Sequence, residues 1–213
     1  MKKNIKFLAL AFAGLLMTSC AGNVEVEEVV EETTPECMYS YDAETTEVGF
    51  VAYKFLNRTG VGGAFETISM TGVEAANSAI AVLENVSFEI EVESLNTKDA
   101  GRDEKVKTFF FKEIDTDVIA GKMVSIDEAG NATVEITMNG VTNNVEGTYT
   151  LNDTEFAFTA EIDVLDWEAG NGIEALNEEC HELHIDLAND ETESKLWSEV
   201  TVSFKTTLTK VCE

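Results

Sequence analysis

Apolar and polar residues alternate strictly along the segment 86–93. Val86, Phe88, Ile90 and Val92 are apolar, and each is followed by a serine or a glutamate. Because the side chains of a strand point to opposite faces with a period of two, this segment predicts a strand with one dry face and one wet face. Further strands are predicted at residues 48–55, 64–70, 118–126, 134–138, 145–151, 156–162 and 200–204. Seven or eight strands with tight turns and little helix favour an antiparallel barrel or sandwich.

Two short helices are predicted between the strands. Residues 96–101 have turn chemistry, Arg102-Asp103-Glu104 can open a helix, and the three phenylalanines at 109–111 close it with a large apolar plug. Such a segment is typical of a cover over the open end of a barrel. A second helix is predicted at residues 172–182. The glycines at 60–63 are interpreted as a hairpin turn or bulge, because the lysine and hydroxyl of a phosphate-binding loop do not follow them.

The first twenty residues have the features of an export signal. Three lysines precede an apolar run at 7–17 that is too short to span a bilayer, and the segment ends in Leu16-Met17-Thr18-Ser19-Cys20. This ending resembles the lipobox of bacterial lipoproteins, in which the cysteine is acylated and becomes the new N-terminus. We therefore expect residues 1–19 to be a lipoprotein signal peptide and Cys20 to anchor the chain in a membrane. The alternative is an ordinary secretory signal with a chance cysteine.

The charge of the chain limits its partners. The formal net charge is −27, and loss of the three lysines in residues 1–19 takes it to −30. A chain of this charge is repelled by nucleic acid, so no nucleic-acid partner is expected. Residues 20–46 are acidic and without a clear period, which predicts a flexible tether, and residues 47–213 form the folded domain. Together, the lipobox-like segment and the tether predict an exported protein that its lipid holds at the bacterial cell envelope, on the periplasmic or the surface side of the outer membrane.

Few residues point to catalysis or to metal binding. Neither a Gly-x-Ser-x-Gly elbow nor a Cys-x-x-Cys pair nor a phosphate-binding loop occurs in the sequence, so no enzyme activity, catalytic residue or cofactor is predicted. Cys180, His181 and His184 are close enough in sequence to suggest a metal site. Zinc usually takes three or four protein ligands, however, and the chain has only these two histidines. Cys180 is therefore interpreted as a buried cysteine or as part of a disulfide rather than as a metal ligand.

A set of short motifs resembles one family along almost all of residues 39–213. These motifs are Gly49-Phe50, Gly63-Ala64-Phe65, Leu95-Asn96-Thr97 with Arg102-Asp103, Val106 through Phe110-Phe111, Met138-Asn139-Gly140-Val141-Thr142, and Trp197-Ser198-Glu199-Val200. Their order resembles the YceI-like family of exported, lipocalin-like, lipid-binding proteins. The resemblance implies an all-β fold, an eight-stranded antiparallel barrel with one or two short helices that holds a long isoprenoid or other alkyl chain.

Two family features are missing. The family often has an Arg-x-Asp-Phe-Gly segment near the penultimate strand, where this chain has Val164-Leu165-Asp166-Trp167-Glu168, and its His-Ser pair is replaced by Thr45-Thr46-Glu47. Head-group contacts made by those residues therefore do not transfer. Arg102 and Asp103 are interpreted as structural residues rather than head-group ligands, with Asp103 at a helix N-terminus and Arg102 bridging to the glutamate-rich strand.

Two functions remain open for such a barrel. It either sequesters or carries a long-chain amphipathic lipid of isoprenoid or fatty-acyl type, or it is a structural or adhesion lipoprotein whose barrel is filled by side chains. The volume of the interior distinguishes the two. If a ligand binds, the apolar faces of the alternating strands and the phenylalanine plug are expected to line its site: Phe88, Ile90, Val92, Phe109, Phe110, Phe111, Val134, Ile136, Met138, Phe156, Phe158, Val202 and Phe204.

Three cysteines remain after Cys20, which allows one disulfide and one free thiol in an oxidising compartment. In a closed barrel with an even number of strands, the start of the first strand and the end of the last lie side by side at one rim. Cys37 precedes the first predicted strand and Cys212 ends the last, so this pair is predicted to be bonded. The alternative joins Cys180 to Cys212 and leaves Cys37 free.

Overall fold

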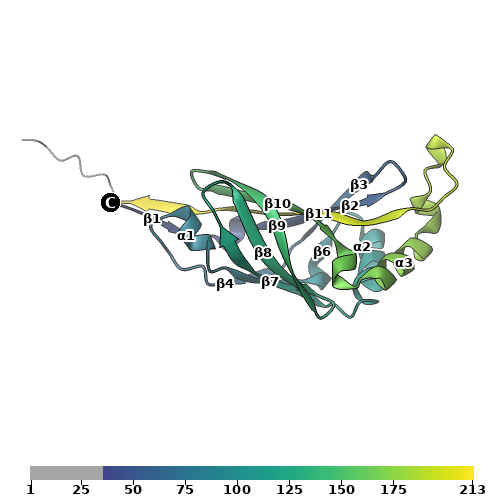
Figure 1. Ribbon diagram of the computed structural model, residues 1–213, viewed down its shortest axis with the longest axis horizontal. Helices are drawn as coiled ribbons and strands as arrows, with labels where there is room; N and C mark the ends of the chain where they lie inside the picture. Colours follow the sequence, from purple (N-terminus) through teal and green to yellow (C-terminus); the bar gives the residue numbers. More distant parts are fainter. Residues whose placement is uncertain (1–35) are drawn as a thin grey trace, which may run out of the picture. The chain divides into compact units, whose positions relative to one another are not determined.

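The computed structural model describes residues 36–213. The predicted signal peptide, most of the predicted tether and the acylated Cys20 lie outside the described residues. The described part forms a ten-stranded antiparallel sheet and a two-stranded one, with short helices at both ends of the larger sheet (Figure 1). The larger sheet consists of β2 (Glu47–Lys54), β3 (Thr59–Phe65), β4 (Ile68–Thr71), β5 (Ser87–Glu91), β6 (Leu95–Asn96), β7 (Val118–Ile126), β8 (Asn131–Met138), β9 (Val141–Asn152), β10 (Glu155–Asp163) and β11 (Leu196–Thr207).

The larger sheet closes on itself. Its order is β4-β5-β7-β8-β9-β10-β11-β2-β3-β6, and β4 and β6 at its two ends are continuations of β3 and β5. β3 pairs with β6 and β4 pairs with β5, while the backbone N–H of Glu66 donates to the Ser94 carbonyl (3.1 Å) and that of Glu91 to the Thr67 carbonyl (3.1 Å). The predicted antiparallel barrel is therefore confirmed. The larger sheet has ten strands rather than eight because two of the eight barrel strands are each interrupted. One is divided into β3 and β4, and the other is divided into β5 and β6 by the 3-10 turn η2 (Val92–Ser94).

The glycine cluster at 60–63 is not a turn, in contrast to the sequence-based expectation. These residues lie inside β3, and the hairpin turns earlier, where Phe55 and Arg58 have positive φ. A Cβ added at Gly63 would lie 2.4 Å from the ring of Phe50 on the neighbouring strand β2. Gly63 therefore leaves space for the Phe50 ring, which lies over the neighbouring strand. Close approach of a neighbouring group is a common reason for glycine inside a strand.

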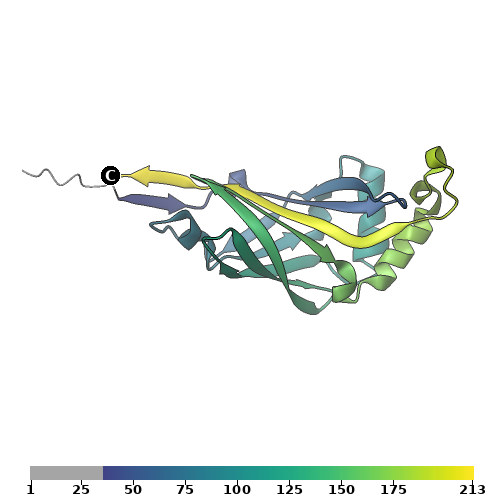
Figure 2. The same ribbon diagram turned by 45° about the horizontal axis from the view of Figure 1, so that its top comes forward.

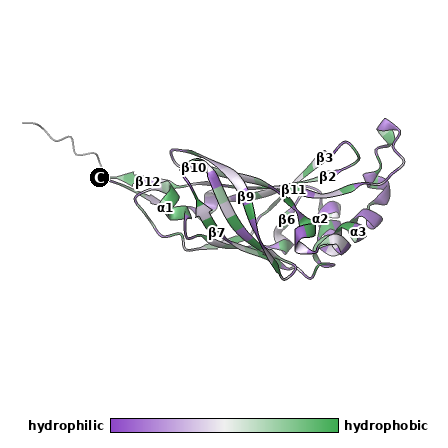
Figure 3. Ribbon diagram, in the orientation of Figure 1, coloured by the Kyte–Doolittle hydropathy of each residue, from purple (hydrophilic) through white to green (hydrophobic). Residues whose placement is uncertain are grey.

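Helix α1 (Ala79–Leu83) covers one end of the barrel. It begins at Ser78, whose hydroxyl accepts a hydrogen bond from the backbone N–H of Ala81 (3.1 Å). Val82 and Leu83 are almost completely buried. The helix is hydrophobic along its length, whereas α3 at the other end is largely hydrophilic (Figure 3). One end of the barrel is thus closed by an apolar helix.

The predicted helix at Arg102 and the predicted phenylalanine plug are both present at the other end. Helix α2 (Ala100–Val106) is capped by Asp99, which accepts hydrogen bonds from the backbone N–H groups of Gly101 and Arg102. Asp103 lies in the first turn of the helix, at the N-terminus as predicted. A π-helical turn, η3 (Lys107–Phe111), follows, and Phe110 and Phe111 pack edge to face with a centroid distance of 5.0 Å. The second predicted helix is α3 (Gly170–Glu179), continued by the 3-10 turn η5 (His181–His184).

The smaller sheet joins the two ends of the described chain. Strand β1 (Cys37–Ser40) pairs with β12 (Thr209–Cys212), and the two lie side by side beyond the barrel (Figure 2). The predicted disulfide between Cys37 and Cys212 is confirmed, and Cys180 is a buried free thiol. Residues 37–46, which the sequence analysis places in the tether, form β1 and the turn η1 (Ala43–Thr45), so the ordered chain starts before residue 47. In the part of the chain that the structure describes, no helix is long and apolar enough to cross a membrane.

Replacing Cys37 and Cys212 together by serine is expected to lower the free energy of unfolding by up to about 5 kcal/mol, because the bond closes a loop of 175 residues in the unfolded chain. Chemical denaturation of both proteins under oxidising conditions measures the difference. The control is the same comparison with a reductant present, where the parent also lacks the bond and the two curves should coincide. A difference that persists in reductant would contradict the assignment.

Candidate functional site

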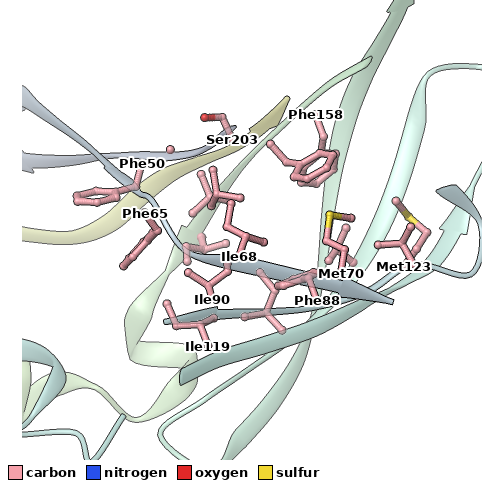
Figure 4. Close-up of a pocket in the computed structure, with 18 of the residues that line it drawn as sticks. Phe50, Phe65, Ile68, Met70, Phe88, Ile90, Ile119, Met123, Phe158 and Ser203 are labelled. Atoms are coloured by element: carbon pink, nitrogen blue, oxygen red, sulfur yellow. The ribbon is translucent and has the colours of Figure 1, made fainter. Parts of the chain in front are cut away.

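An apolar cavity of about 140 Å³ lies inside the barrel near the α1 end. Figure 4 shows its side chains, with Phe158 and Ser203 on one wall and Ile68, Met70 and Phe88 on the facing wall. Among residues 36–213, Ser203 is the only residue with a polar side chain that lines this cavity. A single buried water needs roughly 10–15 Å³ and two to four polar partners, so this cavity is large for a water and offers it few partners. Its chemistry suits an apolar chain.

A second apolar cavity of about 140 Å³ lies under the helices at the other end. Val106, Phe110 and Phe111 from the α2–η3 segment and Leu176 from α3 form its cover. The two cavities share six wall residues, so they adjoin along the inside of the barrel: Phe50, Phe65, Ile119, Met138, Ile162 and Val202.

Most residues predicted from the sequence to line the site do lie on these walls. Phe110 and Phe111 line the second cavity, whereas Val92 is buried in the core and Phe109 is half-buried against it, and neither of these two lines the first or the second cavity. The other nine line the first cavity: Phe88, Ile90, Val134, Ile136, Met138, Phe156, Phe158, Val202 and Phe204. Val92 is displaced because the strand breaks into η2 at that residue and the alternation no longer sets its direction. That these residues bind a ligand remains a prediction.

Several residues that line the first cavity were not predicted from the sequence. Val48 and Phe50 on β2 and Ile119 and Met123 on β7 line the first cavity. Both strands also carry apolar residues on the outer face, such as Val118, so the pattern does not say which face is inside. Ile68 and Met70 also line this cavity and were not predicted, although their alternation with exposed polar residues could have identified them.

A third cavity of about 420 Å³ adjoins the second, and its walls combine apolar residues with several charged side chains. Its apolar floor shares five residues with the second cavity, namely Phe50, Ala52, Val106, Leu176 and Leu196. Its other walls carry charged and titratable side chains from β2, α2 and the α3–η5 segment: Lys54, Asp99, Arg102, Lys105, Cys180 and His184. This cavity is called the mouth below.

Arg102 and Asp103 both hold the same residue, Thr97, at the edge of the mouth. The Arg102 guanidinium donates from Nε to the Thr97 hydroxyl (2.9 Å) and from Nη2 to the Thr97 carbonyl (3.1 Å). The Asp103 carboxylate accepts from the Thr97 backbone N–H (2.8 Å) and from its hydroxyl. The expected bridge from Arg102 to the glutamate-rich strand is therefore wrong, because the buried Thr97 takes the guanidinium instead.

Cys180 and His184 do not form a metal site with the groups around them. Within residues 36–213, no group of three or more histidine, cysteine, aspartate or glutamate side chains is arranged to hold a metal ion. Burial raises the pKa of the Cys180 thiol, so it is protonated at neutral pH. Burial, together with the positive charges of Lys54, His181 and Lys105, lowers the pKa of His184 from 6.5 to about 4. The His184 ring is thus neutral at pH 7, with Nδ1 2.8 Å from the Asn177 side-chain oxygen.

The closed antiparallel ring and its apolar interior cavities define a lipocalin-like barrel. A model of the YceI-like domain matches residues 39–208, and the chain belongs to the YceI-like family. No curated protein is similar enough to be matched.

Two of the solved structures that are similar to this chain illustrate the shared fold. BcnA from Burkholderia cenocepacia has 20% identity and a TM-score of 0.52, over 80% of this chain and 99% of that one. A polyisoprenoid-binding domain from Saccharophagus degradans, implicated in plant cell wall breakdown, has 18% identity and a TM-score of 0.54, over 82% of this chain and 98% of that one.

The low pKa of His184 makes a prediction about stability. Between pH 6.5 and pH 4 the unfolded chain binds a proton at His184 and the folded protein does not, so the free energy of unfolding falls as the pH falls through this range. The expected loss is about 1–3 kcal/mol. Denaturation curves at several pH values should show a shallower pH dependence for His184→Gln than for the parent. His181→Gln, at an exposed position of the same turn, is the matched control. It removes only one of the smaller causes of the His184 shift, so it should retain most of the pH dependence of the parent. Parallel curves for the parent and His184→Gln would rule the effect out.

Proposed function

We propose that the protein is an exported, lipid-anchored binding protein that sequesters or carries a long-chain amphipathic lipid of isoprenoid or fatty-acyl type inside its barrel. The observation that carries the proposal is the pair of adjoining apolar cavities along the barrel interior. A barrel whose only task is structural has no need of such space, and side chains usually fill the interior of a barrel of this size. The cavities therefore favour a binding protein over a structural or adhesion protein with a filled barrel.

The energetics of an alkyl chain suit this interior. Burying one methylene contributes about 0.8 kcal/mol, so ten methylenes contribute roughly 8 kcal/mol before the cost of immobilising the chain. The walls of both cavities are almost entirely apolar, and no buried charge has to be desolvated when a chain enters. The polyisoprenoid-binding domain from Saccharophagus degradans makes an isoprenoid the first ligand to test.

The membrane anchor is the second part of the proposal. It rests on the lipobox-like sequence that ends in Cys20. The disulfide between Cys37 and Cys212 supports export, because such bonds persist in oxidising compartments such as the bacterial periplasm or the cell surface. The acyl chain would then hold a lipid-binding barrel close to a membrane that supplies or receives its ligand.

Narrowing the first cavity is expected to abolish lipid binding. Val134 is buried on β8 and lines this cavity, so Val134→Trp places an indole in the space that the chain would occupy. Native mass spectrometry of the purified protein should then find no co-purified lipid, and delipidated protein should take up no isoprenoid or fatty-acyl probe. Far-UV circular dichroism should be unchanged.

Thr133→Trp is the matched control, since Thr133 lies next to Val134 on the same strand and is directed to the opposite face. This variant should bind like the parent. Should delipidated parent protein take up neither an isoprenoid nor a fatty-acyl probe, the structural alternative is favoured instead.

Replacing Cys20 by serine is expected to release the protein from membranes or to block its processing, because the acylated thiol is lost. Fractionation of cells that express the parent and the variant, with the mass of the mature protein, measures both effects. Cys180→Ser is the control, because it removes a thiol that lies inside the folded domain. A Cys20→Ser protein that matures and fractionates like the parent would refute the anchor.

A further inference from the structure

The mouth has the opposite charge balance to the rest of the chain. The whole sequence has 41 acidic and 14 basic residues. The mouth is lined by three basic residues, Lys54, Arg102 and Lys105, and by one acidic residue, Asp99. The Asp99 carboxylate is already engaged, since it accepts hydrogen bonds from two backbone N–H groups at the start of α2. A concentration of positive charge in so acidic a protein needs a specific explanation.

Two of these cations have no carboxylate partner within residues 36–213. The Lys54 ammonium donates one hydrogen bond to the Leu183 carbonyl (3.0 Å), and Arg102 uses two of its five N–H donors on Thr97. Lys105 is different, because its ammonium lies 3.0 Å from the Glu179 carboxylate. Lys54 and Arg102 therefore keep free donors at a cavity wall, and Lys105 adds a charge that Glu179 partly balances.

The charge at the mouth also acts on its neighbours. The pKa of the buried His184 falls to about 4, and the positive charges of Lys54 and Lys105 contribute to this after burial itself. The positive side chains of Lys54 and Lys105 are thus close enough to the His184 ring to act on it.

The opposite end of the barrel carries the opposite charge. A polar surface pocket beside α1 and the turns after β7 and β9 is lined by Glu84, Asp127, Glu128 and Asp153. Asp153 is paired with Lys210 (2.7 Å), whereas the other three carboxylates form no ion pair within residues 36–213. An anion is therefore repelled at the α1 end and attracted at the mouth. The apolar cavities lie between these two ends, and only the mouth shares walls with them.

We propose that the mouth is a binding site for an anionic head group, so that the barrel selects amphiphiles with a carboxylate or phosphate and holds them with the tail towards α1. This inference rests on the proposed lipid-binding function. The apolar floor that the mouth shares with the second cavity lets one molecule occupy both. Charge-assisted hydrogen bonds from the Lys54 ammonium and the Arg102 guanidinium would fix the anionic oxygens.

The test compares three probes that share one chain length and differ in head group: hexadecanol, palmitate and hexadecyl phosphate. Delipidated full-length protein should bind both anions about tenfold or more tightly than the alcohol in calorimetric titrations. Added salt should weaken the two anions and leave the alcohol unchanged. A carboxylate that binds as tightly as the phosphate indicates a fatty-acyl ligand, and a phosphate that binds more tightly indicates a phosphorylated lipid. Either order supports an anion site as long as both exceed the alcohol.

Charge variants locate the site. Lys54→Met combined with Lys105→Met is expected to weaken both anions about tenfold and to leave the alcohol unchanged. Lys205→Met is the matched control, because Lys205 is exposed on β11, forms no ion pair among residues 36–213 and lines none of the three cavities. The single variant Lys54→Met retains the ion pair between Lys105 and Glu179. It replaces the double variant in the same titrations if the double variant does not fold.

The outcomes separate the two proposals. Equal affinity of the parent for all three probes would overturn the head-group site and leave the lipid-binding function intact. An anion preference that Lys54→Met does not reduce would also overturn it. If none of the three probes, and no isoprenoid alcohol such as geranylgeraniol, binds to the delipidated parent, the lipid-binding function itself fails.

Discussion

The pairing of β11 with β2 is the contact on which the rest of the structure depends. It joins the two ends of the barrel sequence, from Lys205 opposite Glu47 to Leu196 opposite Lys54. Closing the ring removes the exposed strand edges that an open sheet would present to other chains. It also fixes which face is inside, because a slip of one residue would turn Val48 and Phe50 outwards. The interior cavities exist only while this register holds.

The two ends of the ring are closed in different ways, which gives the interior a direction. At one end α1 buries Val82 and Leu83, and β1 and β12 continue beyond it as a disulfide-bonded pair. At the other end, helices α2 and α3 pack over the barrel and leave the mouth between them and β2. β11 runs from the mouth to the disulfide-bonded end, and its register is irregular only near the mouth, between Leu196 and Val200.

The sequence predicts strands well where one face is apolar and the other polar, as around Phe88 and Ile136, because the side-chain period then sets both the element and its direction. Where both faces are apolar, as in β2, the strand itself is predicted but its inward face is not. The prediction of the strand fails where a glycine accommodates a neighbouring ring, as Gly63 does for Phe50. The interior volume could not be predicted, because it is the small difference between the space inside the ring and the summed volume of the side chains. The mouth was missed because Lys54 lies on β2, far in sequence from Arg102, and only barrel closure brings their elements together.

The missing family arginine fits this arrangement. Its position corresponds to Val164, which is buried in the turn η4 (Val164–Trp167) and lines the second cavity. The neighbouring Trp167 is also buried, and its indole N–H donates to the Ile136 carbonyl (3.0 Å), so this turn places no charge inside the barrel. A cation at Val164 would face apolar walls and would have to be desolvated there, at a cost of several kcal/mol. With an apolar residue at that position, the positive charges next to the interior are those of the mouth, where Thr97 accepts hydrogen bonds from Arg102 and the Leu183 carbonyl accepts one from Lys54. The two apolar cavities and the charged mouth thus follow one another along the barrel.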